Sequence, residues 1–74
     1  MNRSLGQKLK QLREKKELTQ KEASDRIGCT FNMLSNYELD KREPNIGTLK
    51  SIAIFYNVSI DYLVGISETP NPLT

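Results

Sequence analysis

The sequence predicts a small all-α protein, a compact bundle of five helices. Apolar residues recur at helical spacing along the chain, first at Leu5, Leu9 and Leu12. A Ser, Thr or Asn that suits the N-cap position precedes each apolar stretch. The chain has 74 residues, of which 36% are hydrophobic, so it has room for one small core. These three observations together favour a single helical domain.

The first predicted helix runs from Leu5 to Lys15. Ser4 and Gln7 have the spacing of a capping box, in which two side chains satisfy free N–H groups of the first turn. Gly6 lies inside this turn, where glycine costs about 1 kcal/mol relative to alanine. It indicates either the close approach of a neighbouring segment or simple tolerance near a helix end.

The second predicted helix, Gln20 to Ile27, ends at a tight glycine turn. Thr19 and Glu22 form a second capping box. Gly28 can adopt a positive φ, which most residues avoid, and Cys29 follows as a small apolar residue that we expect to be buried and inert. The chain can therefore turn sharply into another helix.

A third helix is predicted from Phe31 to Glu38, with Thr30 as its N-cap. At about 100° per residue, Leu34 and Tyr37 mark the side that faces the core. The other side has no charge but many hydrogen-bonding groups. It carries Asn32, Ser35 and Asn36, with Phe31 and Met33 near its N-terminal edges. An ordinary solvated surface is the alternative interpretation of such a face.

Two more helices complete the predicted bundle. Pro44 interrupts the chain, and Asn45 can cap a fourth helix. Ser59 can cap a last helix that ends at Gly65. The core side of the fourth helix repeats at i, i+3, i+4 and i+7 through Leu49, Ile52, Ala53 and Tyr56. Residues 1–66 are therefore the predicted domain. Residues 67–74, with two prolines and no periodicity, are predicted to be a linker or disordered tail.

These features resemble the Cro and phage-repressor (XRE-type) family of helix-turn-helix DNA-binding domains. The likeness extends from about Leu5 to Gly65, and its residues are Gln20, Gly28, the stretch from Phe31 to Glu38, and the basic loop Lys41-Arg42-Glu43-Pro44. The resemblance implies a lambda-repressor-like bundle whose second and third helices form the helix-turn-helix. It also implies double-stranded operator DNA as the partner.

The chain departs from the family pattern at two places. Ala23 and Ser24 stand where the family usually has Leu and Ala, so another side chain, for which Tyr56 is our candidate, must fill the lost volume. Asp40 stands where the family favours Gly, and Asp tolerates the left-handed conformation. Neither departure argues against the fold.

The third helix is the candidate base-contacting element. Asn can bond bidentately to adenine in the major groove, Ser can donate or accept, and an apolar side chain can rest on a thymine methyl. The predicted base-contacting residues are Phe31, Asn32, Met33, Ser35 and Asn36.

Phosphate contacts are predicted around this helix. By resemblance, Gln20 contacts the DNA backbone and braces a side chain of the third helix, at a helix N-terminus that attracts anions. Asn45 can act in the same way, as a plain helix cap, or as both. The full predicted set is Gln20, Thr30, Lys41, Arg42 and Asn45, and the basic residues Lys8, Lys10, Arg13, Lys15 and Lys16 are either further contacts or solvated surface.

An ion pair between Arg13 and Glu38 is implied by the same resemblance. Glu38 lies at the border of the core side, where an unpaired carboxylate would be costly and a bidentate Arg would satisfy it. We expect a partly buried, structural pair. The alternative is two separate surface charges that contribute little.

Composition narrows the function classes. The formal charge is only +2, from eleven basic and nine acidic side chains, so net charge is weak evidence for a polyanionic partner. One cysteine and no histidine argue against a disulfide, a zinc site or another metal, and no motif indicates a cofactor or an enzyme. No membrane span or signal segment is predicted, which favours a cytoplasmic protein.

We therefore expect a sequence-specific DNA-binding repressor or regulator of phage or mobile-element type. A protein-interaction module on the same fold, such as an antitoxin or adaptor, is the alternative. Helix-turn-helix proteins commonly bind DNA as dimers, so we expect a homodimer. Its candidate contacts are Ile54, Phe55 and Tyr62, whereas Val58 and Ile60 are expected in the core.

Overall fold

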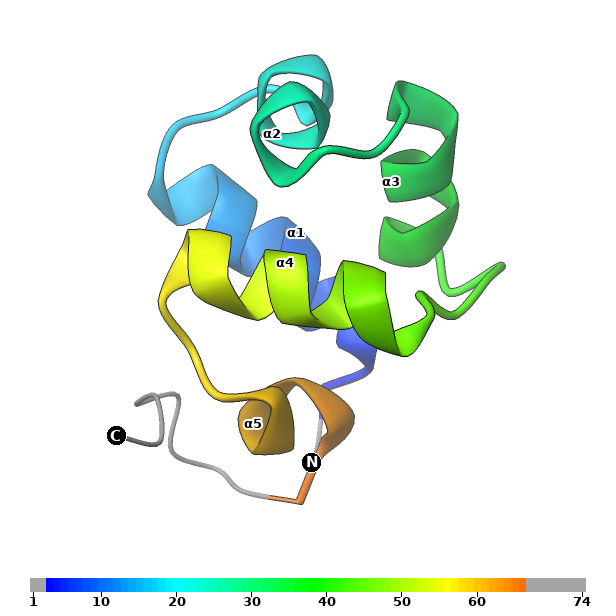
Figure 1. The fold of residues 1–74 in the computed structure, drawn as a ribbon. Coiled ribbons are helices and arrows are strands. Elements are labelled where there is room, and N and C mark those ends of the chain that lie inside the picture. Colours follow the sequence, from blue (N-terminus) through cyan, green and yellow to red (C-terminus); the bar gives the residue numbers. More distant parts are fainter. Residues whose placement is uncertain (1–2, 67–74) are drawn as a thin grey trace.

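The computed structural model describes residues 3–66 and contains five helices around one core (Figure 1). They are α1 Leu5–Lys15, α2 Gln20–Ile27, α3 Phe31–Glu38, α4 Ile46–Tyr56 and α5 Ile60–Val64. No strand occurs among these residues, so the predicted all-α fold and its helix boundaries are confirmed. The predicted tail, residues 67–74, lies outside the described residues. No helix between residues 3 and 66 is long and apolar enough to cross a bilayer.

Local side-chain bonds set where the helices begin. Ser4 and Gln7 form a capping box at α1, and Thr19 and Glu22 form another at α2. The Glu22 carboxylate accepts from the Thr19 backbone N–H at 2.9 Å, and this bond lowers the pKa of Glu22. Because such bonds connect residues three apart, they can be recognised without knowledge of the tertiary structure.

The core lies where the five helices meet, and α2 contributes Ala23 and Ile27 to it. Leu9, Leu34, Ile52 and Leu63 are its largest fully buried apolar side chains. Tyr56, our candidate to fill the volume left by Ala at position 23, is 5% exposed and belongs to the same buried cluster. Burial raises its pKa to about 12, and its hydroxyl has no hydrogen-bond partner among residues 3–66.

The N-terminus of α1 crosses the end of α3 at Gly6, and this close approach explains the glycine. A Cβ at Gly6 would meet the carbonyl oxygen of Glu38 and lie 2.7 Å from that of Tyr37. The Gly6 backbone N–H also donates to Asp40 Oδ1 at 2.9 Å. Asp40 itself has a φ of 60°, the left-handed conformation expected for it. Of the two explanations offered for Gly6, close approach is therefore the correct one.

A buried ion pair fixes α3 against α1, as the resemblance implied. Arg13 Nε lies 2.8 Å from Glu38 Oε2, and a second bond joins Arg13 to Oε1 at 3.1 Å. The Glu38 side chain is 2% exposed. Its hydrogen bond with Arg13 is the main reason that the pKa of Arg13 is raised. Gln20 Nε2 also donates to Glu38 Oε1 at 3.0 Å, so the carboxylate joins α1, α2 and α3.

Replacing Gly6 with Ala is expected to destabilise the protein. Helix propensity alone would gain about 1 kcal/mol, but the backbone atoms of α3 leave no room for the methyl group, and overpacking costs about 1 to 3 kcal/mol. Gly47→Ala is the control, since a Cβ there would meet only Asn45 Oδ1 at 3.5 Å. Urea unfolding should show a lower midpoint for Gly6→Ala and an equal or higher midpoint for Gly47→Ala. Equal urea midpoints for the two variants would contradict the close approach of α3 to Gly6.

Replacing Arg13 with Met is expected to cost about 3 kcal/mol, because it leaves the buried Glu38 carboxylate without its cation. Lys21→Met is the control. Lys21 pairs with Asp25 at 3.8 Å on the exposed surface, where ion pairs contribute less than about 1 kcal/mol. The free energy of unfolding measures both changes. A loss for Arg13→Met no greater than that for Lys21→Met would show that the buried pair does not anchor α3.

Candidate nucleic-acid interface

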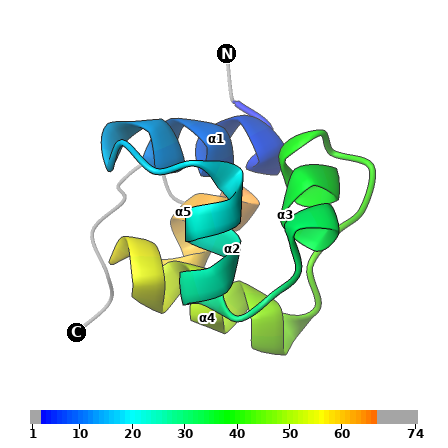
Figure 2. The ribbon, with the colours of Figure 1, turned by 90° about the horizontal axis from the view of Figure 1, so that it is seen from above.

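A tight turn joins α2 to α3. Gly28 has a φ of 95°, and the backbone N–H groups of Gly28 and Cys29 both donate to the Ser24 carbonyl, at 2.9 and 3.0 Å. The Thr30 hydroxyl then accepts from the Met33 N–H at 3.1 Å and caps α3. Figures 1 and 2 both place α3 at the outer edge of the molecule. The turn and its caps therefore present a short helix at the periphery.

The two sides of α3 differ in burial as predicted. Leu34, Tyr37 and Glu38 are buried against the rest of the bundle. Phe31 is 49% exposed, Asn32 is exposed, and Ser35 and Asn36 are half-buried, so these four side chains retain access to solvent. The open part of this face is widest at the N-terminal half of α3.

Met33 lies at the edge of the open face. It is half-buried and packs against the core cluster. Its position lies about a quarter of a turn from the core direction, and a long flexible thioether can lie back on apolar neighbours. Met33 therefore has less surface to offer to a base than Phe31 or Asn32.

The candidate phosphate-contacting residues surround α3. Thr30, Lys41, Arg42 and Asn45 are exposed, and the Asn45 side chain also caps α4 by accepting from the Thr48 N–H at 2.8 Å. Gln20 is half-buried. One of its amide hydrogens is committed to Glu38, so its bracing partner is an acidic residue of α3. The helix cap expected for Asn45 is therefore present.

The helix α1 and its C-cap position hold five basic residues, and two of them are not available as surface charges. Lys8 is only 7% exposed, its ammonium group donates to the Tyr62 carbonyl at 2.7 Å, and it lies 5.0 Å from the centre of the Tyr62 ring. Arg13 is held by Glu38. The other three, Lys10, Lys15 and Lys16, are exposed, and the ammonium group of Lys16 lies 5.7 Å from the centre of the Phe55 ring.

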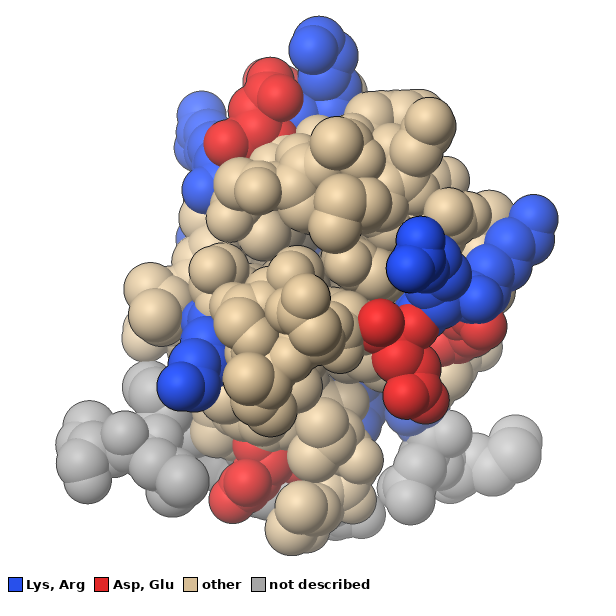
Figure 3. All heavy atoms as spheres, turned by 45° about the vertical axis from the view of Figure 1, so that its right-hand side comes forward, with Lys and Arg blue, Asp and Glu red and all other residues tan. Residues whose placement is uncertain are grey.

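The surface around α3 is mostly uncharged. Figure 3 brings forward the side of the molecule on which α3 lies, and Lys and Arg side chains gather near the edges of this view rather than at its centre. Acidic side chains lie next to some of them. Neutral hydrogen-bonding groups with cations at the margin suit the contact of bases at the centre and phosphates outside.

The candidate dimer contacts have different positions. Ile54 is 80% exposed on α4. Phe55 is half-buried, with its ring 4.9 Å from that of Tyr56, and Tyr62 is only 9% exposed, because α1 covers it through Lys8. The expectation that Tyr62 contacts a second subunit is therefore wrong. Val58 and Ile60 belong to or pack on the core, as expected.

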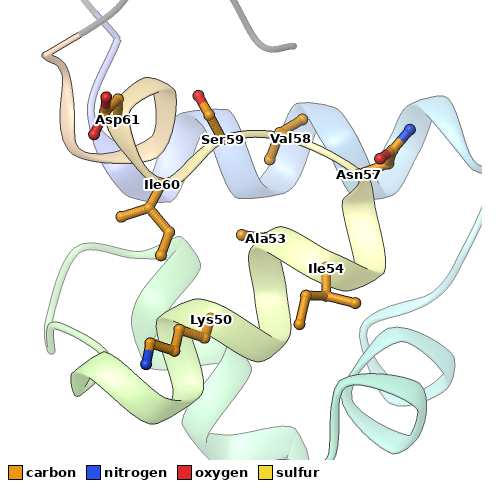
Figure 4. A pocket seen from close by; sticks show the side chains of 8 residues that line it. All are labelled: Lys50, Ala53, Ile54, Asn57, Val58, Ser59, Ile60 and Asp61. Carbon is orange, nitrogen blue, oxygen red and sulfur yellow. The ribbon is translucent and has the colours of Figure 1, made fainter. Parts of the chain in front are cut away.

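A groove of about 430 Å³ runs beside Ile54, between the end of α4 and the start of α5 (Figure 4). Its walls are mainly apolar, with Lys50 and Asp61 among the lining residues. A second, smaller hollow on the other flank is lined by Arg26, Ile27, Ser51, Ile54 and Phe55. Ile54 thus borders hollows on both sides. Cys29 lies apart from them, half-buried, and burial raises the pKa of its thiol.

Asp40 connects the loop after α3 to the start of α1, a contact that the sequence did not reveal. Its tolerance of the left-handed conformation was predicted, but its carboxylate also bonds to the N-terminus of α1. The signal in the sequence was the acidic residue itself, at a position where the resemblance favours glycine.

Comparison with known proteins places this geometry in a family. The sequence model described as Helix-turn-helix matches residues 9–63. The chain is 49% identical over 65 residues to the HTH-type transcriptional regulator ImmR of Bacillus subtilis, covering 88% of this chain and 51% of that protein. It is 37% identical to the cryptic phage CTXphi transcriptional repressor RstR of Vibrio cholerae, covering 84% of this chain and 56% of that protein. The chain thus spans about half the length of these curated relatives.

Solved structures share the fold. The P22 c2 repressor, determined in complex with a synthetic operator, superposes with a TM-score of 0.82 at 24% identity, over 85% of this chain and 96% of that one. The N-terminal DNA-binding domain of SinR from Bacillus subtilis gives a TM-score of 0.74 at 28% identity, over 80% of this chain and 87% of that one. The match to the family over most of its length, together with these relatives, shows that the chain belongs to the helix-turn-helix family of the phage-repressor type.

Proposed function

We propose that this chain binds double-stranded DNA in a sequence-specific manner and acts as a transcriptional regulator, specifically a repressor of phage or mobile-element type. The observation that carries the proposal is the division of α3 into two sides. One side is anchored by a buried ion pair, and the other leaves an exposed Asn and a half-exposed aromatic ring at the edge of the molecule.

Base contacts are assigned to four residues of α3. Asn32 and Asn36 can each bond two atoms of an adenine edge, Ser35 can serve as donor or acceptor, and Phe31 can contact a thymine methyl. The exposure of Asn32 and Phe31 supports direct contact. Ser35 and Asn36 lie nearer the bundle, so their contacts require α3 to enter the groove deeply.

Phosphate contacts are assigned to the surroundings of α3. Two helix N-termini, those of α2 at Gln20 and of α4 beside Asn45, offer free backbone N–H groups and the positive end of a helix dipole. Thr30, Lys41 and Arg42 add exposed donors. These contacts would set the register of α3 along the duplex.

The names of the relatives support regulation rather than catalysis. ImmR is a transcriptional regulator, RstR is a phage transcriptional repressor, and the P22 c2 repressor was solved with an operator. A regulator of this kind acts on DNA in the bacterial cytoplasm, so the proposal includes a cytoplasmic location. It includes no enzymatic activity.

Binding to duplex DNA is expected to weaken steeply with salt. Each phosphate neutralised contributes about −0.9 to the slope of log affinity against log salt concentration. On a duplex with a single half-site, Lys41→Ala and Arg42→Ala should each make the slope less steep by about 0.9, whereas Lys50→Ala, in the groove beside Ile54, should not change it, because no dimer contact contributes there. Fluorescence anisotropy across a salt series measures all four slopes. A wild-type slope near zero would refute DNA binding.

Alanine at Asn32 or Asn36 is expected to reduce sequence discrimination. On a preferred site, selected from a random pool, each change should cost about 1 to 3 kcal/mol, because a bidentate contact to a base is lost. On random duplex the loss should be far smaller, since phosphate contacts remain. Equal losses on both duplexes would mean that these two amides do not contact bases.

A homodimer belongs to the proposal as its second part. The exposed Ile54 borders an apolar groove, and a two-fold axis would let Ile54 of each copy enter the groove of the other. Lys50 and Asp61 both line this groove, so oppositely charged side chains are available to pair across the axis. The same surface would suit the alternative function, in which the chain binds another protein as an antitoxin or adaptor does.

Ile54→Asp is expected to weaken self-association and cooperative binding to a symmetric operator, while binding to a single half-site is retained. Ile66→Asp is the matched control, because Ile66 is 77% exposed and does not line the groove. Sedimentation and anisotropy measure the two effects. Unchanged cooperativity in Ile54→Asp would exclude this dimer, and a wild-type protein that binds no duplex at low salt would favour the protein-interaction alternative.

A further inference from the structure

We infer that Asp40 is a positioning residue for DNA binding. Its carboxylate accepts two hydrogen bonds at the N-terminus of α1, a contact that we call the clasp. The clasp holds the loop with the basic residues Lys41 and Arg42 in place beside α3. This inference rests on the proposed function. It concerns a residue that contacts no DNA in the proposal and that differs from the usual residue of the resembled family.

The clasp uses both oxygens of the carboxylate. Oδ1 accepts from the Gly6 backbone N–H at 2.9 Å, and Oδ2 accepts from the Ser4 hydroxyl at 2.6 Å. Ser4 is also the N-cap of α1, where its hydroxyl oxygen accepts from the Gln7 N–H at 3.2 Å. The carboxylate therefore lies at the positive end of the α1 dipole, where an anion is stabilised.

The backbone around Asp40 is tied to α3 as well. The N–H of Asp40 donates to the Tyr37 carbonyl at 3.1 Å, and the N–H groups of Lys41 and Arg42 both donate to the Asn36 carbonyl, at 2.9 and 3.4 Å. The main chain thus folds back over the last turn of α3, while the Asp40 side chain reaches α1. The backbone of the two basic residues that follow is therefore bonded to α3, and the Asp40 side chain connects the same loop to α1.

Net charge alone would predict the opposite role for Asp40. A carboxylate next to phosphate-contacting cations repels the DNA backbone, so its removal would strengthen binding through simple electrostatics. If the clasp positions the loop, removal of the Asp40 carboxylate weakens binding to DNA, because Lys41 and Arg42 lose their ordered positions. The sign of the change therefore separates the two explanations.

Two variants distinguish charge from geometry. Asp40 has a φ of 60°, a conformation that both Gly and Asn adopt readily, so Asp40→Gly and Asp40→Asn preserve the backbone. Asn keeps an acceptor for the Gly6 N–H and can donate to the Ser4 hydroxyl, whereas Gly removes the clasp. Asp25→Asn, on the exposed surface of α2, is the control for the loss of one negative charge.

We expect Asp40→Gly to bind random duplex more weakly than wild type, with a salt slope less steep by about 0.9 for each of Lys41 and Arg42 that loses its phosphate. Asp40→Asn should bind at least as tightly as wild type, with the wild-type slope. Amide hydrogen exchange without DNA supplies an independent measurement. Exchange at Gly6 and Lys41 should accelerate in Asp40→Gly but not in Asp40→Asn.

Each result decides the inference. If Asp40→Gly binds as tightly as wild type or more tightly, at an unchanged slope, the positioning role is wrong while DNA binding stands. Unchanged exchange at Gly6 in Asp40→Gly would show that no clasp forms in solution. A wild-type slope near zero would instead refute the proposed function, and the role of Asp40 with it, even if the exchange results reveal the clasp.

Discussion

The buried carboxylate of Glu38 is the contact on which the orientation of α3 depends. It receives two hydrogen bonds from Arg13 of α1 and one from Gln20 of α2, and its side chain is 2% exposed. A helix of eight residues cannot hold its position by its own stability, since isolated helices of this length are marginal in water. Tertiary contacts must therefore fix it. A fork-shaped guanidinium bonded to a carboxylate restricts direction as well as distance, which apolar packing alone does less well.

This anchor explains how the polar groups of α3 are divided. The charged group is buried and paired on one side, and neutral amides occupy the other. Neutral amides lose little on leaving water when they find partners on a base edge, so a face of this kind gains more from specific contacts than from general attraction to phosphate. In the proposed function, the loop cations would supply affinity and α3 would supply discrimination.

Helix boundaries were predictable because their signals are local. The capping side chains each accept from the N–H group three positions on, and all five helices begin directly after the capping residues Ser4, Thr19, Thr30, Asn45 and Ser59. The pair of Arg13 with Glu38 came from resemblance rather than from spacing, since 25 residues separate its members. The burial of Lys8 and Tyr62 escaped prediction because it depends on how α5 packs on α1, 54 positions apart in sequence. The packing of Met33 on the core cluster was likewise not predictable, since helical spacing fixes a direction but not where a flexible side chain lies.

The net charge of +2 does not show which charged side chains are bonded within the protein and which are exposed. Glu38 is neutralised by Arg13, Asp40 is bonded to the start of α1, and Glu22 is occupied at the start of α2. Three carboxylates in and around the helix-turn-helix are thus committed to contacts within the protein. Lys41, Arg42, Lys10, Lys15 and Lys16 stay exposed. A duplex approaching α3 would meet one carboxylate, that of Glu38, whose charge is paired with Arg13, and exposed cations in the loop that follows. Salt screens exposed charges from the duplex beyond a Debye length of about 8 to 10 Å, so only cations close to the duplex contribute much. In the proposed function, the pairing of Glu38 with Arg13 removes one negative charge from the surface beside α3, so the placement of charges supports contact with a polyanion more than the net charge does.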